Sequence, residues 1–362
     1  MTKGPVASFV SALAVFGIFS FAPSAFGIQH LPLTERYEFS ARQMGTEARI
    51  VLFAADEAAA RDAAAKAFAR VAALDAVMSD YRDDSELMAL CRLAGSGPVR
   101  VSGDLFRVLD ASQRLAQESG GAFDVTAAPL IHLWRRARRI GQLPDRTDLA
   151  AAQALTGFAM MTLDARERTV ALRQRRMQLD LGGIGKGFAA DEAAAVLKDL
   201  GYPNSLVALG GDVVASGAPP GAPGWTVDVE TLSRAEQGTP RVLLRDAAVS
   251  TSGDAEQWVE IGGVRYSHII DARTGAALTG RRSVTVIAPA GTLSDGLATA
   301  VSVLGPARGL ALVAKTPGAS TSISFADDGR VRTVTSPGWR YFVAAGSGPI
   351  STRRNSTSEP SA

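Results

Sequence analysis

Residues 179–189, LDLGGIGKGFA, place four glycines within six positions between two apolar segments. Glycine lets the backbone come close to a ligand and adopt a positive φ. The amides at the start of a helix attract anions, and Lys186 adds a positive charge. The spacing differs from that of a Walker A loop and of a dinucleotide-binding fingerprint. We therefore expect a strand, a glycine loop and a helix, with a phosphate site and a plain tight turn as the two open interpretations.

The segments on both sides of this stretch mix strands and helices without a regular alternation. Apolar runs predict strands at 177–181 and 242–249. Helical spacing of apolar residues predicts a helix capped by Asp56, and further helices at 187–200 and 295–304. This order favours an α+β fold, with mixed sheets and packed helices, over a doubly wound parallel sheet.

The composition of the 362 residues is that of a globular protein, with 46% hydrophobic residues. The charges nearly balance, at 38 Lys+Arg against 36 Asp+Glu, which argues against a nucleic-acid-binding protein. The single cysteine, Cys91, excludes an intrachain disulfide and a Cys-rich metal site. With only three histidines in the chain, we expect any metal to be held by oxygen atoms.

Two aspartates next to small residues are candidates for binding a metal ion or a ligand hydroxyl. Asp295 and Thr299 lie four positions apart in SDGLATA, so on a helix they face the same side. Together with a backbone carbonyl they suit Mg²⁺, while the alternative is a capping aspartate and a threonine bonded to its own helix. Asp212 follows a glycine pair, where it either binds a hydroxyl or caps a turn.

A histidine, an aspartate and an arginine lie close together in YSHIIDARTG, residues 266–275. His268 is either a base or a buried structural histidine, and Asp271 and Arg273 are either a site or an ion pair within a turn. Hydroxyls also gather in STSGD, residues 250–254, but no nucleophile elbow is present, so a serine-hydrolase triad is a weak alternative.

Taken together and in this order, six motifs resemble the ApbE family, the bacterial FAD:protein FMN transferases. The resemblance covers most of the chain, from about Met44 to Leu304 and beyond. The motifs are QMGT (43–46), MSDY with DSEL (78–81 and 84–87), GAFDVT (121–126), DLGGIGKG (180–187), SHIID with RTG (267–271 and 273–275) and DGLAT (295–299).

The resemblance implies an enzyme that binds FAD and Mg²⁺, splits the pyrophosphate and transfers FMN to a Ser or Thr hydroxyl of a partner protein, releasing AMP. In the family the acceptors are usually subunits of membrane redox systems. The resemblance also assigns His268 as the base for the acceptor hydroxyl, which suits a side chain that titrates near neutrality. The implied metal ligands are the carbonyl of Gly185 and the side chains of Asp295 and Thr299. The implied FAD contacts are Met44, Tyr81, Ala122, Phe123, Asp124, Gly182, Phe188 and Ile270.

Three departures from the family pattern loosen local turns at the expected site without removing a metal ligand. Gly185 stands where alanine is frequent, Ser294-Asp295-Gly296 replaces Ala-Asp-Ala, and Ala272 replaces a proline. Two other functions stay open. One is a metal-dependent FAD pyrophosphatase that gives FMN and AMP, and the other is a periplasmic FAD-binding accessory protein without catalysis.

The first residues predict export. An uncharged apolar run from Val6 to Ala22 follows Lys3, and AFG at 25–27 has the spacing that signal peptidase recognises. We expect residues 1–27 to be a signal peptide, 28–345 an ApbE-like transferase domain in the periplasm, and the polar residues 346–362 a disordered tail. The alternative is a retained anchor at the inner membrane, because about 17 apolar residues are at the short limit for a span.

Overall fold

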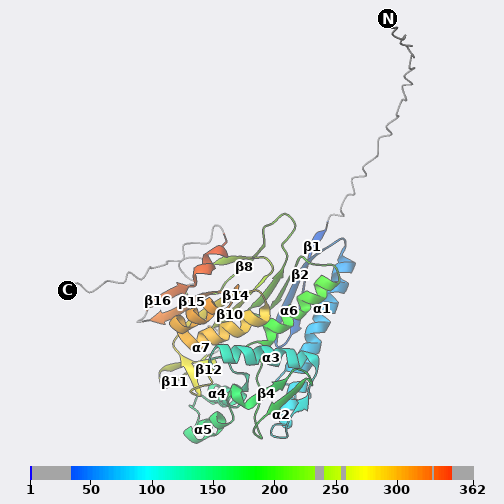
Figure 1. Ribbon diagram of the computed structural model, residues 1–362. Coiled ribbons are helices and arrows are strands. Elements are labelled where there is room, and N and C mark those ends of the chain that lie inside the picture. The colour runs from blue at the N-terminus through cyan, green and yellow to red at the C-terminus, as the bar shows by residue number, and fades with distance from the viewer. Residues whose placement is uncertain (2–33, 233–239, 254–257, 328–329, 345–362) are drawn as a thin grey trace, which may run out of the picture. The chain divides into compact units, whose positions relative to one another are not determined.

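An eight-stranded antiparallel sheet runs through the centre of the fold (Figure 1). The computed structural model describes Met1 and residues 34–232, 240–253, 258–327 and 330–344, so the predicted signal peptide and tail lie almost wholly outside the described residues. In spatial order the strands are β1 (Glu35–Gln43), β2 (Thr46–Ala54), β6 (Ser205–Leu209), β7 (Asp212–Ser216), β10 (Ala247–Gly253), β14 (Arg282–Ala288), β15 (Ser320–Asp327) and β16 (Arg330–Thr335).

The two faces of this sheet are buried against different partners, because side chains alternate along a strand. On β2, Ile50 and Leu52 join the main core, whereas Val51 joins a second core on the opposite face. The helices α1 (Glu57–Met78), α6 (Gly185–Asp199) and α7 (Gly291–Lys315) supply the main core. The second core is closed by the hairpin of β8 (Trp225–Asp228) and β9 (Arg241–Leu244) and by the 3₁₀ helix η3 (Pro337–Tyr341).

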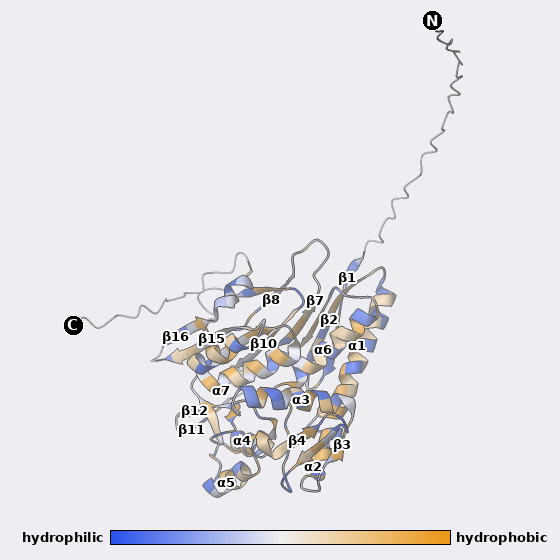
Figure 2. Ribbon diagram, viewed as in Figure 1, coloured by the Kyte–Doolittle hydropathy of each residue, from blue (hydrophilic) through white to orange (hydrophobic). Residues whose placement is uncertain are grey.

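Beyond these helices lies a further layer, drawn in the lower half of Figure 1. Figure 2 shows hydrophilic residues on α3 and α5 and mostly apolar ones along α7. The layer contains the helices α2 (Glu86–Arg92), α3 (Gly103–Glu118), η1 (Val125–Ala127), α4 (Ala128–Ile140), α5 (Arg146–Ala154) and η2 (Phe158–Met160). It also contains two small sheets, β3 (Val99–Arg100) with β5 (Thr169–Leu172) and β4 (Met161–Asp164), and β11 (Trp258–Ile261) with β12 (Val264–Asp271) and β13 (Ala276–Thr279).

The α+β prediction is confirmed, and so is the predicted cap of α1, since Asp56 accepts a hydrogen bond from Ala59 N. The predicted strand at 177–181 is wrong. Its amides bond elsewhere, with Leu179 N donating to Cys91 Sγ and Asp180 N to Val125 O, so it pairs with no strand. The predicted strand at 242–249 is two strands, because the backbone turns at Asp246 with a φ of 47°.

Helix α7 is longer than predicted and is the core helix against which other elements pack. It contacts α3, α6, β10 and β14. Its length and hydropathy would suit a membrane span, but half of its most apolar stretch of 18 residues is buried inside this fold. Gly305, with a φ of 73°, and Pro306 interrupt it. These observations describe a buried helix of a layered domain.

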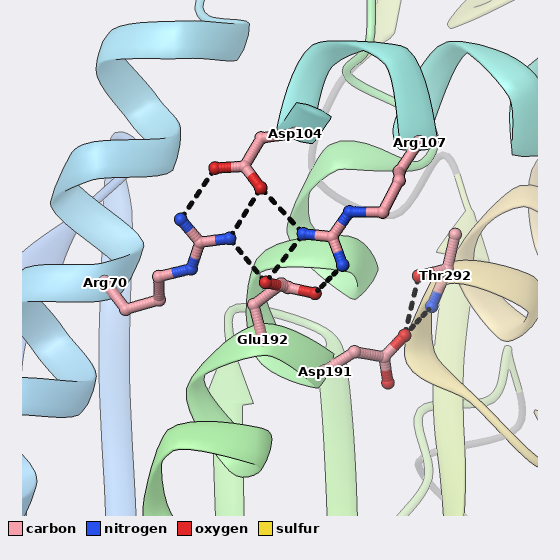
Figure 3. Close-up of polar contacts among 6 residues, drawn as sticks. All are labelled: Arg70, Asp104, Arg107, Asp191, Glu192 and Thr292. Carbon is pink, nitrogen blue, oxygen red and sulfur yellow. Dashed lines mark hydrogen bonds and ion pairs between the residues drawn. The ribbon is translucent and has the colours of Figure 1, made fainter. Parts of the chain in front are cut away.

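An ion-pair network joins α1, α3 and α6 (Figure 3). Arg70 binds both oxygens of Asp104 at 2.7 Å, and Arg107 donates to Asp104 and Glu192. Arg70 also pairs with Glu192. The hydrogen bonds from Arg70 lower the pKa of Asp104 to about 2. The network therefore favours the charged carboxylate in the folded protein.

Replacing Asp104 by Asn should reduce the free energy of unfolding at pH 7 by about 1–2 kcal/mol. Because the folded-state pKa is depressed, the contribution of Asp104 is fully present above the unfolded pKa and is lost as the pH falls toward 2. The difference between wild type and Asp104→Asn in urea unfolding should thus be constant above about pH 5 and shrink below it. Asp62→Asn, which breaks an exposed pair with Lys66, is the control and should change stability by less than about 0.5 kcal/mol. A difference that persists at acid pH would contradict the assignment.

Candidate functional site

The N-terminal ends of α6 and α7 touch backbone to backbone. A Cβ at Gly187 would lie 2.1 Å from the carbonyl oxygen of Gly291, and one at Gly291 would lie 2.6 Å from that of Gly187. Gly187 N also donates to Asp295 Oδ2 at 3.0 Å. This approach requires glycine at both positions, because any side chain would force the helices apart.

Near this contact lie two side-chain oxygen atoms without a hydrogen-bond partner in the described part of the chain. Among the described residues, Asp295 Oδ1 and Thr299 Oγ1 make no hydrogen bond, although Ser302 Oγ on the same helix bonds back to Ala298. The cap-and-back-bond interpretation is therefore wrong: Asp295 is the fifth residue of α7, and the hydroxyl of Thr299 does not bond to its own helix. Free carboxylate and hydroxyl oxygens on one face are what a hard cation requires.

The glycine loop lies against these oxygens. A Cβ at Gly183 would be 2.9 Å from Thr299 Oγ1 and 3.5 Å from the ring of Phe123. One at Gly185 would be 3.9 Å from Cε of Met44, which occupies the β1–β2 turn with a φ of 47°. The structure thus brings Met44, Phe123 and the expected metal ligands to the same loop.

The site carries a surplus of buried negative charge. Asp212 forms an ion pair with Lys186, which accounts for the carboxylate after the glycine pair. Burial, together with the negative charge of Asp212, raises the pKa of Asp295 to about 7, and Lys186 opposes this shift. A divalent cation beside Asp295 would relieve the same repulsion.

Tyr81 is connected to the glycine loop through an arginine that the sequence did not single out. Tyr81 is 79% exposed, and the guanidinium of Arg135 lies 4.7 Å from the centre of its ring. Arg135 also binds Asp80 and Asp180 at 2.6 and 2.7 Å, and Asp180 accepts from Gly182 N at 2.7 Å. Arg135 lies on α4.

Three of the expected FAD contacts direct their side chains into the fold. The carboxylate of Asp124 accepts hydrogen bonds from Thr126 and from Phe158 N, and burial raises its pKa. Phe188 is buried beneath the guanidinium of Arg107, and Ile270 packs in a core cluster with residues of α4. For Asp124 the carboxylate is already occupied, and its backbone oxygen accepts a hydrogen bond from Ala127 N at 3.2 Å.

His268 lies on β12 at an irregularity in the pairing with β13, between Tyr266 and Ile270. It is half-buried, and the next residue, Ile269, packs with Ala122 and Val303. The turn that follows also approaches the 121–126 motif, since Arg273, paired with Asp271, would lie 3.7 Å from a Cβ at Gly121. The end of β12 is therefore beside residues 121–122.

The hydroxyls of Ser250 and Thr251 have structural partners. Ser250 Oγ bonds to Ser294 Oγ at 2.8 Å, and Thr251 bonds to Thr285 at 3.0 Å. These bonds attach β10 to α7 and β14, and give no support to a serine-hydrolase triad. Gly296 admits Leu115 of α3, whose Cδ2 would be 2.4 Å from a Cβ there, so this departure from the family pattern serves packing.

Two other features of the described part of the chain bear on where a site could lie. No group of three or more His, Cys, Asp or Glu side chains is placed to hold a metal there. A cavity of about 910 Å³ lies among α2, α4, α5 and residues 175–178, but none of the expected site residues lines it. The chemistry is therefore assigned to the helix ends rather than to this cavity.

Comparison with known proteins identifies the family of the chain. The sequence profile of the ApbE family matches residues 44–323. A FAD:protein FMN transferase of Treponema pallidum is 37% identical over 305 residues, or 80% of this chain and 84% of the relative. The structure is similar to that of the flavin transferase ApbE from Vibrio cholerae, with a TM-score of 0.77, 30% identity and coverage of 85% of this chain and 99% of the other. It is equally similar to the Pseudomonas stutzeri flavinyl transferase ApbE, with a TM-score of 0.77, 29% identity and coverage of 87% and 99%.

Replacing Gly187 by Ala should destabilise the protein by more than about 3 kcal/mol, or prevent folding, because the new methyl group meets the backbone of Gly291. Gly103→Ala, at the first residue of α3, is the matched control. A Cβ at Gly103 would meet only Arg168 Nη1 at 3.8 Å, so its stability should stay within about 1 kcal/mol of wild type. Urea unfolding measures both, and equal stability of the two variants would show that the helices can separate without cost.

Proposed function

The chain belongs to the ApbE family, and we propose that it transfers FMN from FAD to a hydroxyl of an acceptor protein, using Mg²⁺ at the junction of α6 and α7. One observation carries the proposal: the oxygens of Asp295 and Thr299 that make no hydrogen bond in the described chain lie against the glycine loop. Together with the carbonyl of Gly185, which the family resemblance implies as a ligand, the carboxylate and the hydroxyl would form an all-oxygen donor set that fits Mg²⁺. When bound, Mg²⁺ neutralises charge that develops on the phosphoryl oxygens.

The residues of the chain would divide the reaction between them. Lys186 adds positive charge beside the pyrophosphate, held in place by Asp212. His268 would take the proton from the acceptor hydroxyl, whose oxygen then attacks the phosphorus of the FMN half. The anhydride bond breaks, and AMP leaves with the electron pair. Met44, Phe123 and Tyr81 would border the flavin nucleotide, because Met44 and Phe123 lie near the glycine loop and Tyr81 is exposed.

The proposal includes the place where the protein acts. The apolar run at residues 6–22 and the AFG at 25–27 support export to the periplasm, where the Ser or Thr acceptor would belong to a membrane redox system. Mass spectrometry of the protein from its host measures the N-terminus, and a chain that retains Met1 in the cytosol contradicts this part.

One assay separates transfer from its two alternatives. The protein is incubated with FAD, Mg²⁺ and a candidate acceptor domain, and the products are examined by in-gel flavin fluorescence and chromatography. A fluorescent acceptor band with release of AMP supports transfer. Free FMN and AMP without a band indicate a pyrophosphatase, and unchanged FAD indicates an accessory flavin-binding protein.

The side chains of Asp295 and Thr299 should differ in their importance for FMN transfer. Asp295→Asn should reduce Mg²⁺-dependent transfer by about a hundredfold or more, because it removes the only carboxylate among the proposed ligands. Thr299→Ala should have a smaller effect, since water can replace a neutral hydroxyl. Ser302→Ala is the control on the same helix, because its hydroxyl bonds to Ala298, and it should leave transfer unchanged. Equal activity of Asp295→Asn and Ser302→Ala would overturn the metal site.

His268→Gln should keep FAD binding and lose most of the transfer, by about a hundred- to ten-thousandfold, as expected when a general base is removed. The pH–rate profile of the variant should differ from that of wild type, because the base whose protonation stops the reaction is absent. Fluorescence titration of FAD separates this result from a loss of substrate binding. An unchanged rate and pH profile would remove His268 from the mechanism.

A further inference from the structure

Helix α7 begins without a capping side chain of its own. The residue before its first turn is Ala290, which offers no side-chain acceptor to the first amides. The carboxylate of Asp191, on α6, takes this role instead. Its Oδ1 accepts from Gly291 N at 2.6 Å, and its Oδ2 accepts from Thr292 N at 2.8 Å and from Thr292 Oγ1 at 2.6 Å. Figure 3 shows Asp191 directed at Thr292.

The residue next to Asp191 makes a separate set of contacts. Glu192 is bound by Arg70 of α1 and Arg107 of α3 (Figure 3). Helix α6 is thus connected to α1 and α3 through Glu192 and to α7 through Asp191. The two sets involve different partners, so the ion pairs of Glu192 can be removed without breaking the hydrogen bonds of Asp191.

The position of Asp191 relates it to the proposed metal ligands. It lies one turn after Gly187 on α6, while Thr292 lies about one turn before Asp295 on α7. Together with the contact of Gly187 and Gly291, the hydrogen bonds of Asp191 set the spacing and register of the two helices. That spacing determines how far Asp295 and Thr299 lie from the glycine loop.

We propose that Asp191 is a positioning residue, a cap supplied from one helix to the next, that holds α7 where its oxygens can bind Mg²⁺ together with the loop of α6. The inference rests on the proposed function, because it presupposes metal binding at this junction. Both carboxylate oxygens are used, so an amide of the same shape is not equivalent. One end of an asparagine would present N–H groups to a donor of α7.

The test measures metal binding directly, on the full folded protein. Calorimetric titration with Mg²⁺ alone, and with Mn²⁺ as a second probe, is combined with melting temperature and FMN transfer. Asp191→Asn should weaken Mg²⁺ binding by about 10–100-fold, the range found when groups that orient metal ligands are lost. Thr292→Ala, which removes one of the three donors, should weaken it less and serves if Asp191→Asn fails to fold.

Glu192→Gln is the matched control, since it loosens α6 from α1 and α3 without touching α7. It should lower the melting temperature and leave the Mg²⁺ affinity within about threefold of wild type. If Asp191→Asn and Thr292→Ala bind Mg²⁺ as wild type does, or if Glu192→Gln weakens binding equally, the inference is overturned and the proposed function stands. A wild-type protein that binds neither cation overturns the proposed function and the inference with it.

Discussion

The close contact between the starts of α6 and α7 is the constraint on which the site depends. Gly187 and Gly291 allow the two helices to touch through their backbones, at a separation that any side chain at these positions would prevent. The hydrogen bond from Gly187 N then orients Asp295, leaving its other oxygen unbonded within the described chain. Everything that we assign to metal binding follows from this geometry, because the donors belong to segments more than a hundred residues apart.

Electrostatics adds a cost that the protein offsets only in part. The carboxylates of Asp191, Asp212 and Asp295 are all shielded from water near the helix junction. The positive charge of Lys186 lies beside Asp212 and Asp295. Asp191 is compensated by amides at a helix start, where negative charge is favourable. Asp295 keeps a raised pKa, which is the signature of a buried carboxylate without sufficient positive charge around it.

The further layer of the fold contributes several of the residues proposed to contact FAD and connects them to the glycine loop. Arg135 joins Tyr81, Asp80 and Asp180 through stacking and ion pairs, and Asp180 in turn holds Gly182. A continuous series of contacts therefore connects α4 to the glycine loop. On the other side, β12 places His268 next to residues that pack against Ala122 and α7.

The sequence by itself determined the family, the fold class, the helix cap at Asp56, and the identity of the candidate oxygen ligands. These depend on local patterns, such as a capping residue before an apolar period or glycines in a fixed motif. The sequence did not determine that residues 177–181 lie outside any sheet, because their hydrogen-bond partners, Cys91 and Val125, come from distant segments. Nor did it reveal Arg135 or Asp191. A charged residue in a helical pattern normally faces solvent, and only the approach of α4 to Tyr81 and of α6 to α7 shows that these two face partners instead.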